Sequence, residues 1–174
     1  MGNILRVAVL AASVLAAIGS ASAPKQHDVQ RASTLHAGYD DTWSAVIDVF
    51  ADHNWAIDKL DESSGIITTD WMSLGSHGSE YADCGSAPLA STETPQVRFN
   101  VRVKEDDGGT SITVNTSFRV TRTFDNSSRV IECTSKGEVE ATIRSETEQA
   151  ARANGRRKRP EPAIAVDAGV DGGE

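Results

Sequence analysis

The sequence predicts an α+β protein in which an antiparallel sheet packs on and around helices. Three patterns lead to this prediction. Residues 39–71 combine a helical apolar periodicity with a hairpin pattern, residues 96–121 alternate between apolar and polar side chains on both sides of a turn, and residues 137–153 repeat a helical pattern. The expected order is a first strand, a helix, two strands, a long loop, two long strands, a short strand and a final helix.

The N-terminus is typical of a secretory signal peptide over residues 1–23. A short segment with one positive charge precedes an apolar run, residues 7–18, that is too short to span a bilayer as a stable helix. Ala21 and Ala23 fit the small-residue cleavage pattern, so we expect cleavage near residues 19–23, with an uncleaved anchor as the alternative. No cysteine lies near this point, so lipid attachment is not expected. These features predict a periplasmic or secreted protein.

The rest of the chain has the length of one domain. Residues 24–32 are predicted to be a flexible N-terminal segment, residues 33–153 a single domain, and residues 154–174, which lack aromatic side chains, a disordered tail. The formal net charge of −8 at pH 7 argues against a nucleic-acid partner, because phosphate binding needs a basic surface.

The first helix is expected to begin with Asp40 or Asp41 as its cap and to end near Asn54, a residue that tolerates the left-handed conformation. A strand over residues 33–37 precedes it. Two short strands follow, joined by a turn in which Gly65 supplies a positive φ. The apolar face of the helix is expected to consist of Trp43, Val46, Ile47 and Phe50.

The bulky side chains of this unit allow two interpretations. They are either packed in the core, or they line a groove between helix and sheet that holds a small apolar ligand or a peptide. The residues concerned are Trp43, Ile47, Phe50, Trp55 and Trp71.

Residues 72–95 show no periodicity and are rich in small and polar residues, as in a long functional or disordered loop. Four side chains in this loop, Ser76, His77, Ser79 and Asp83, match no nucleophile–base motif. The sequence also contains no glycine-rich phosphate loop, zinc-ligand spacing or dinucleotide fingerprint. We therefore predict no catalytic residue, no metal and no cofactor, with a hydrolase that uses this loop as an alternative.

The chain contains two cysteines, Cys84 and Cys133. An even number of cysteines in an exported protein indicates one disulfide bond between them. Two free thiols, or a metal site that includes His77, are the alternatives.

Residues 96–121 are predicted to form a long hairpin with one buried face and one wet face. Arg122 falls on the inward side, so the second strand is expected to end or bulge there, and a short strand over 130–133 follows. The inward side chains are Val97, Phe99, Val101, Val103, Ile112, Val114, Phe118 and Val120. The wet face carries Arg98, Arg102, Lys104 and Arg119, which form either an ordinary solvated surface or a docking surface for an acidic partner or lipid headgroups.

Ser135 and Glu138 match a capping box that opens the last helix, expected from about residue 137 to about residue 153. Val139, Ile143 and Ala150 are expected to form its thin apolar stripe. Its glutamates, among them Glu138, Glu140, Glu146 and Glu148, make it acidic, and its second half is expected to be exposed.

Three segments resemble bacterial periplasmic domains of the helix-grip type. Residues 40–50 and 55–71 are similar to a helix that leads into a hairpin whose second strand begins Gly-Ile-Ile and ends near a tryptophan, and residues 133–140 are similar to a motif that opens the last helix. The family resembled is component C of the outer-membrane β-barrel assembly machinery, whose members are lipoproteins. The resemblance implies a sheet curled around a helix that serves in binding or scaffolding, with no active site.

We therefore expect a non-enzymatic envelope protein that binds a protein partner, with the outer membrane surface as a further candidate partner. A carrier of a small apolar ligand is the first alternative, and the hydrolase is the second. The partner's identity and the oligomeric state do not follow from the sequence.

Overall fold

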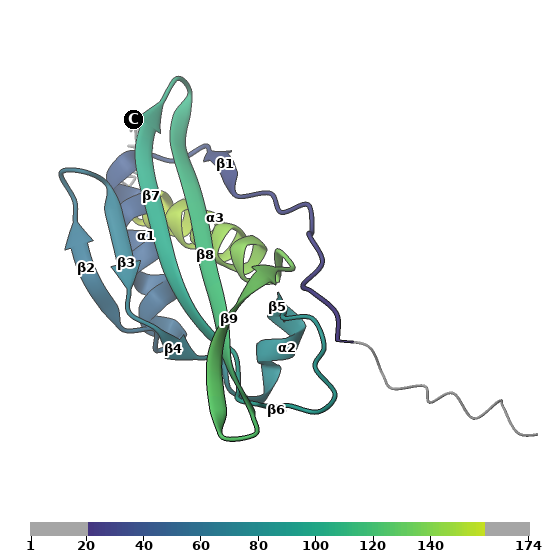
Figure 1. Ribbon diagram of the computed structural model, residues 1–174. Helices are drawn as coiled ribbons and strands as arrows, with labels where there is room; N and C mark the ends of the chain where they lie inside the picture. Colours follow the sequence, from purple (N-terminus) through teal and green to yellow (C-terminus); the bar gives the residue numbers. More distant parts are fainter. Residues whose placement is uncertain (1–20, 159–174) are drawn as a thin grey trace, which may run out of the picture.

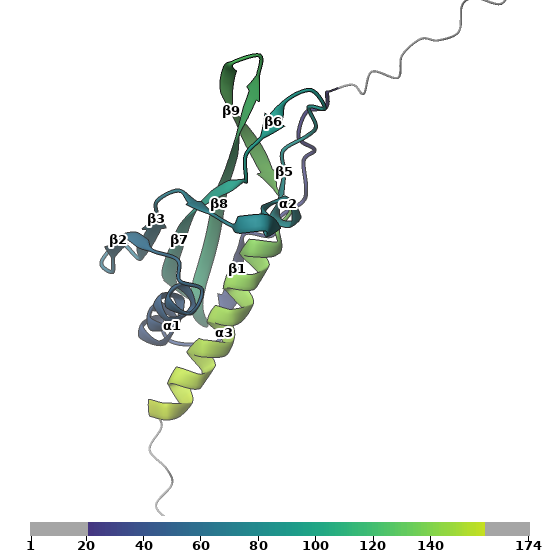
Figure 2. The same cartoon turned by 90° about the horizontal axis from the view of Figure 1, so that it is seen from below.

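The computed structural model describes residues 21–158. The predicted signal peptide up to residue 20 and the predicted tail from residue 159 lie outside the described residues. Figures 1 and 2 show two layers, an antiparallel sheet and the helices α1 and α3, which cover one face of it. This arrangement confirms the predicted α+β class. The elements are β1 (Ala32–Leu35), α1 (Tyr39–Asp52), β2 (Ile57–Asp61), β3 (Ile66–Thr69), β4 (Met72–Ser73), η1 (Gly75–His77), α2 (Gly78–Tyr81), β5 (Ala82–Asp83), β6 (Ser91–Thr92), β7 (Gln96–Asp106), β8 (Gly109–Phe124), β9 (Ser127–Ser135) and α3 (Glu138–Lys158).

Helix α1 starts differently from the prediction. It begins at Tyr39, and Gly38 occupies the cap position without a side-chain hydrogen bond. The prediction that Asp40 or Asp41 caps the helix is wrong, because both residues lie inside the first turn. Their negative charges still favour the helix there, since its N-terminus carries the positive end of the dipole.

The end of α1 agrees with the prediction. Asn54 has a φ of 54°, and its N–H donates to the Ala51 carbonyl at 3.0 Å while the Trp55 N–H donates to the Phe50 carbonyl at 2.8 Å. This pair of hydrogen bonds is a Schellman ending, which satisfies carbonyls left over at a helix C-terminus. It turns the chain into β2 and places the Trp55 ring 4.7 Å from the Phe99 ring.

The β7–β8 hairpin forms the centre of the sheet, in which the strands follow the order β2-β3-β7-β8-β9-β5 and β1 pairs with β8. Ile47 is only half-buried, whereas the rest of the predicted apolar face of α1 is buried in the core. All eight side chains predicted to face inward from the hairpin are buried between the sheet and the helices: Val97, Phe99, Val101, Val103, Ile112, Val114, Phe118 and Val120.

Residues 72–95 are not one irregular loop, contrary to the prediction. They contain β4, η1, α2, β5 and β6, and their short strands pair with β7, β9 and β8. Each of these elements is too short to produce a periodic pattern in the sequence. The short strands are defined by their hydrogen bonds to strands elsewhere in the chain. A disulfide joins Cys84 in this segment to Cys133 in β9, as predicted.

Strand β8 continues through Arg122 to Phe124, so the prediction that it ends or bulges at Arg122 is wrong. The Arg122 guanidinium donates to the carbonyls of Cys84 at 2.7 Å and Gly85 at 2.9 Å. An inward-facing cation is tolerated because carbonyl oxygens of the disulfide-bonded segment face it at this end of the sheet. Strand β9 is also longer than the predicted short strand over 130–133.

The predicted capping box between Ser135 and Glu138 is replaced by a different arrangement. Ser135 Oγ accepts the Gly137 N–H at 3.0 Å and donates to the Glu140 carboxylate at 2.8 Å. Glu140, one of the glutamates that make the helix acidic, is fully buried.

The C-terminal half of α3 also differs from the prediction. Ala151, and not Ala150, is buried, and the helix continues to Lys158, so residues 154–158 are helical and not part of a disordered tail. Lys158 Nζ lies 2.6 Å from Asp41 Oδ1, and hydrogen bonding to this carboxylate raises the pKa of Lys158. No helix within residues 21–158 has both the length and the apolar character that a membrane span requires.

The segment before β1 contacts the domain at several points. Ser22 exchanges backbone hydrogen bonds with Ser86, and Val29 is buried. His27 lies 3.5 Å from the Asp83 carboxylate, which also accepts the Gly85 N–H at 2.8 Å. The Gly85 hydrogen bond is the main cause of a lowered pKa at Asp83. The flexibility expected for residues 24–32 stays a prediction.

Candidate interaction surface

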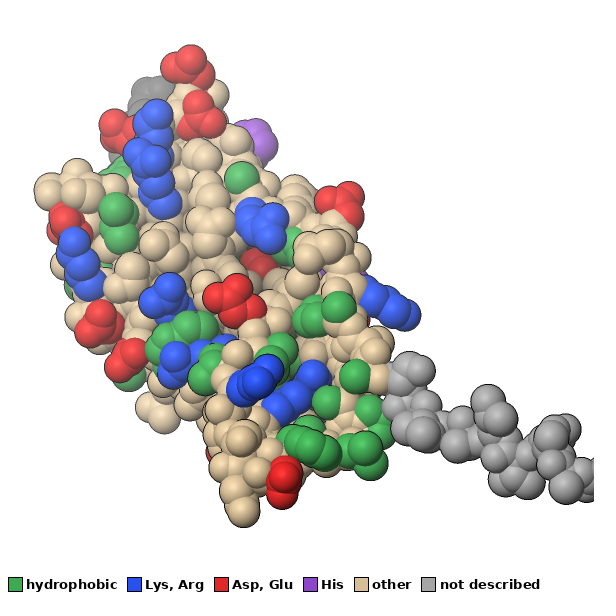
Figure 3. Space-filling model, in the orientation of Figure 1, with side chains coloured by type: hydrophobic (Ala, Val, Ile, Leu, Met, Phe, Trp, Pro, Cys, Tyr) green, Lys and Arg blue, Asp and Glu red, His purple; other side chains and the backbone are tan. Residues whose placement is uncertain are grey.

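The face of the sheet opposite α1 and α3 is open and carries a row of cations. Buried and exposed side chains alternate along β7, so every second side chain points outward. Three of the outward side chains, Arg98, Arg102 and Lys104, therefore lie in one line along the strand, and all three are exposed. Arg119 on β8 faces the same side and is half-buried. Figure 3 shows basic side chains spread along this face. Acidic side chains gather at the upper tip and the left margin, and others lie among the basic ones in the middle of the face, at its right edge and at its lower end (Figure 3).

Trp71 belongs to this open face and not to the predicted groove. The Arg119 guanidinium carbon lies 3.9 Å and that of Arg98 5.1 Å from the centre of the Trp71 ring. The inclusion of Trp71 among groove residues is therefore wrong. The physical reason is a one-residue shift in the pairing with β7 after β3, since Thr68 is opposite Asn100 whereas Met72 is opposite Val97. The Trp71 N–H donates to the Asp70 carboxylate at 2.7 Å within this shift, and the next residue, Met72, packs against the core.

Arg119 is held in place by a neutral partner. Its Nε donates to Gln96 Oε1 at 2.9 Å, and Gln96 is directly opposite Arg119 in the strand register. Glu132 on β9 is opposite Arg119 on the other side. Within residues 21–158, however, no ion pair involves any of the four predicted basic-face residues. Sequence reasoning missed Gln96 and Trp71 as parts of this face. The alternation of β7 could have identified Gln96, which has the same parity as Arg98, whereas the outward position of Trp71 depends on the register shift between β3 and β4.

Of the other residues of the predicted groove, Trp43 and Phe50 fill space in the core, whereas Ile47 and Trp55 are half-buried and pack against it. Trp43 is 5% exposed and Phe50 is fully buried. Phe50 and Trp55 pack edge to face with centroids 5.6 Å apart, and Trp55 also stacks on His53 at 4.3 Å. Side chains packed in this way occupy the space between helix and sheet, so the observed geometry gives no support to a ligand-carrying groove there.

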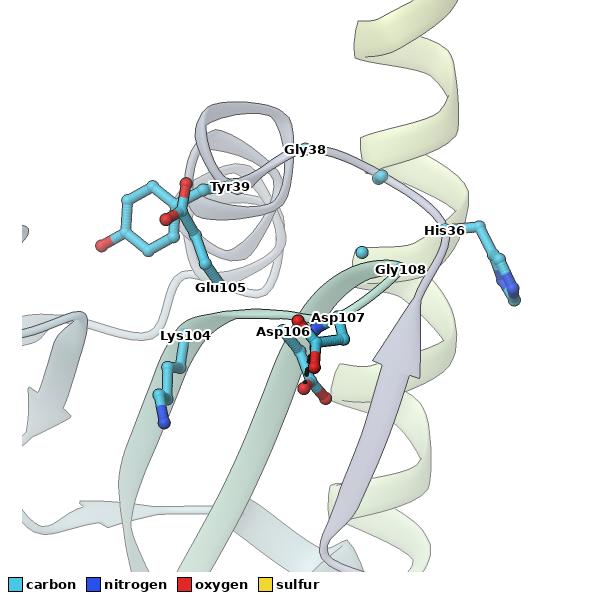
Figure 4. Close-up of a pocket in the computed structure, with 10 residues that line it drawn as sticks. His36, Gly38, Tyr39, Lys104, Glu105, Asp106, Asp107 and Gly108 are labelled. Carbon is cyan, nitrogen blue, oxygen red and sulfur yellow. Dashed lines mark hydrogen bonds between the residues drawn. The ribbon is translucent and has the colours of Figure 1, made fainter.

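An open pocket lies at the top of the β7–β8 hairpin, beside the start of α1. The titratable side chains of its lining are His36, Tyr39, Lys104, Glu105, Asp106 and Asp107, so the last cation of the row on β7 borders three carboxylates. Figure 4 shows these side chains spread around the turn and His36 pointing away. Burial and the nearby carboxylates raise the pKa of Tyr39, because they disfavour its phenolate. The carboxylates make this pocket unsuitable for an anionic ligand.

The candidate catalytic residues of the 72–95 segment are engaged separately. His77 Nδ1 lies 3.3 Å from the Glu80 carboxylate, and the Ser79 carbonyl accepts a hydrogen bond from Lys136 at 2.7 Å. Asp83 faces His27 and the Gly85 N–H instead. In the part of the chain that the structure describes, no group of three or more His, Cys, Asp or Glu side chains could hold a metal ion.

Comparison with known families matches most of the chain to a single family. Residues 29–154 match the model described as "Outer membrane protein assembly factor BamC-like N-terminal domain". No curated protein sequence matches the chain.

Proposed function

Since the chain belongs to the family of BamC-like N-terminal domains of outer membrane protein assembly factors, we propose that it is a non-enzymatic binding module. It holds a protein component of the outer membrane assembly machinery from the periplasmic side. The open sheet face is the docking surface, and α1 and α3 cover the opposite face of the sheet (Figures 1 and 2).

The unpaired cations of the open face are the observation that carries this proposal. In a chain with a net charge of −8, arginines on a surface that binds no partner would be expected to form ion pairs with the abundant carboxylates. Arg98, Arg102 and Lys104 remain without a carboxylate partner among the described residues, and Arg119 is bonded only to a neutral amide. Complementary charge steers a partner to such a surface and fixes its register.

The proposal is tested by site-specific photo-crosslinking of the full chain in its native cells. A photoreactive residue replaces Asn100, Asn115 or Ser117, which are neutral and exposed on the open face, or Ser145 or Gln149, which are exposed on α3. We expect adducts from the open face only, with an outer membrane assembly protein identified in them by mass spectrometry.

Adducts confined to the α3 positions, or none at any position, would contradict the proposal. Thermal unfolding of each purified variant provides the control, because an exposed substitution should leave the melting temperature close to that of the parent protein.

A further inference from the structure

We propose that the open face binds an extended, acidic segment of the partner protein, which lies along β7 with one carboxylate between Arg98 and Arg119. This inference rests on the proposed function and adds the chemistry and the conformation of the segment that is bound. It predicts that binding depends on particular cations and on their spacing, and not on net charge alone.

The spacing of the cations matches an extended chain. Arg98, Arg102 and Lys104 lie on the same side of one strand, so Arg98 and Arg102 are separated by about 13 Å and Arg102 and Lys104 by about 7 Å. Alternate side chains of an extended peptide are also about 7 Å apart. A segment with carboxylates at every second position therefore meets Arg98 and Arg102 in one register. Lys104 lies beside Glu105, Asp106 and Asp107 at the hairpin turn, and these carboxylates oppose an acidic chain at that end of the row.

The Arg98–Trp71–Arg119 cluster is prepared for a carboxylate. Both guanidinium groups lie against one indole ring, although their like charges repel each other. Gln96 fixes Arg119 through Nε, and in residues 21–158 no hydrogen bond engages its two terminal nitrogens. A guanidinium presents such nitrogens as a planar fork that fits the two oxygens of a carboxylate. An anion at this point also offsets the repulsion between the two arginines.

The surroundings of the cations leave room for a bound chain. The residues of β8 opposite the row are short and uncharged, namely Ser111, Thr113 and Ser117. On the neighbouring strand β3, Thr68 is opposite Asn100. Glu132 lies beyond Arg119, on β9, and would repel an acidic chain there. The bound segment is therefore confined to the β7 side of Arg119.

The distribution of apolar side chains favours a protein segment over a lipid surface. Peripheral membrane binding combines cations with apolar side chains that enter the bilayer. The exposed large apolar side chains, Leu60, Leu89, Phe124 and Val130, all lie outside β7. Trp71, the indole among the cations, is only partly exposed and has the guanidinium groups of Arg98 and Arg119 against its ring.

The test uses the purified full chain and a fluorescent eight-residue peptide that alternates threonine with glutamate. Fluorescence anisotropy is measured at 50 mM and 300 mM NaCl, with an otherwise identical peptide carrying glutamine in place of glutamate. We expect binding of the glutamate peptide only, weakened at high salt because exposed charges are screened within about 10 Å at 0.1 M.

The variants locate the site. Arg98→Gln combined with Arg119→Gln should weaken binding about tenfold or more, equivalent to about 1.4 kcal/mol. Arg119→Lys should weaken it several-fold, because it keeps the charge and loses the fork. The matched control, Arg152→Gln combined with Arg156→Gln, removes two exposed arginines on α3 and should change binding less than twofold. Circular dichroism melts confirm that each variant is folded.

Equal binding of the two peptides, or unchanged binding by the Arg98/Arg119 double variant, would overturn the inference. So would binding to vesicles containing phosphatidylglycerol that is lost in the double variant while the glutamate peptide fails to bind. These outcomes leave the proposed function standing, because the crosslinking experiment can still identify an assembly protein on the open face. Conversely, peptide binding without such a crosslink would contradict only the proposed function.

Discussion

Replacing Glu140 with alanine should destabilise the fold by about 3 to 5 kcal/mol. The side chain has 0% exposure and accepts hydrogen bonds from Thr116 at 2.6 Å and Ser135 at 2.8 Å. Hydrogen bonds to charged groups contribute about 1.5 to 3 kcal/mol each. The truncation removes both bonds, leaves two hydroxyl groups without their acceptor, and opens a cavity between α3 and β8.

The assay is urea unfolding followed by tryptophan fluorescence and circular dichroism. Glu138→Ala is the matched control: Glu138 is exposed in the first turn of the same helix, so its loss should cost less than about 1 kcal/mol. Glu140→Gln keeps the shape and one acceptor and should fall between the two. If Glu140→Ala were as stable as Glu138→Ala, the assignment of a buried, doubly bonded carboxylate would be refuted.

Three further predictions concern stability. Replacing both Cys84 and Cys133 with alanine should lower the free energy of unfolding by about 4 kcal/mol on the chain-entropy model, given a sequence separation of 49. Urea denaturation in the absence of reductant measures this loss. A loss below about 1 kcal/mol would contradict the model. Asp83 has a lowered pKa in the folded state. Its contribution to stability is therefore complete above the ordinary aspartate pKa of 3.8 and is lost as the pH falls through the folded-state pKa. Melting temperatures between pH 5 and pH 2 should fall less steeply in Asp83→Asn than in the parent protein. Gly65→Ala should lower the melting temperature much more than Gly108→Ala. Both residues have positive φ, but only the Cβ added at position 65 would collide with a backbone oxygen, that of Val103. Equal effects would show that backbone strain alone decides.

The sequence was sufficient to predict elements whose signal lies within a few neighbouring residues. The alternation of Val97, Phe99, Val101 and Val103 assigns one face of β7 to the core, because successive side chains of a strand point to opposite sides. Asn54 marks the end of α1 for a similarly local reason, since its short polar side chain tolerates a positive φ. The same alternation placed Arg98, Arg102, Lys104 and Arg119 on the wet face. That they serve as a docking surface remains a proposal.

Features that depend on residues distant in sequence could not be predicted in this way. The short strands of residues 72–95 are defined by pairing with β7, β8 and β9, and Arg122 finds carbonyl partners 38 and 37 residues away. Glu140 is one of several glutamates in α3, and one of the hydroxyl groups that bind its carboxylate belongs to Thr116, 24 residues earlier.

The sequence by itself therefore determined the class of fold, the central hairpin and which of its side chains meet water. Only the tertiary structure decided that Trp71 joins the cations and that Glu140 is buried. The reason is physical: local patterns record how a segment divides its side chains between water and the core, whereas the environment of a single side chain depends on which distant groups the folded chain brings to it.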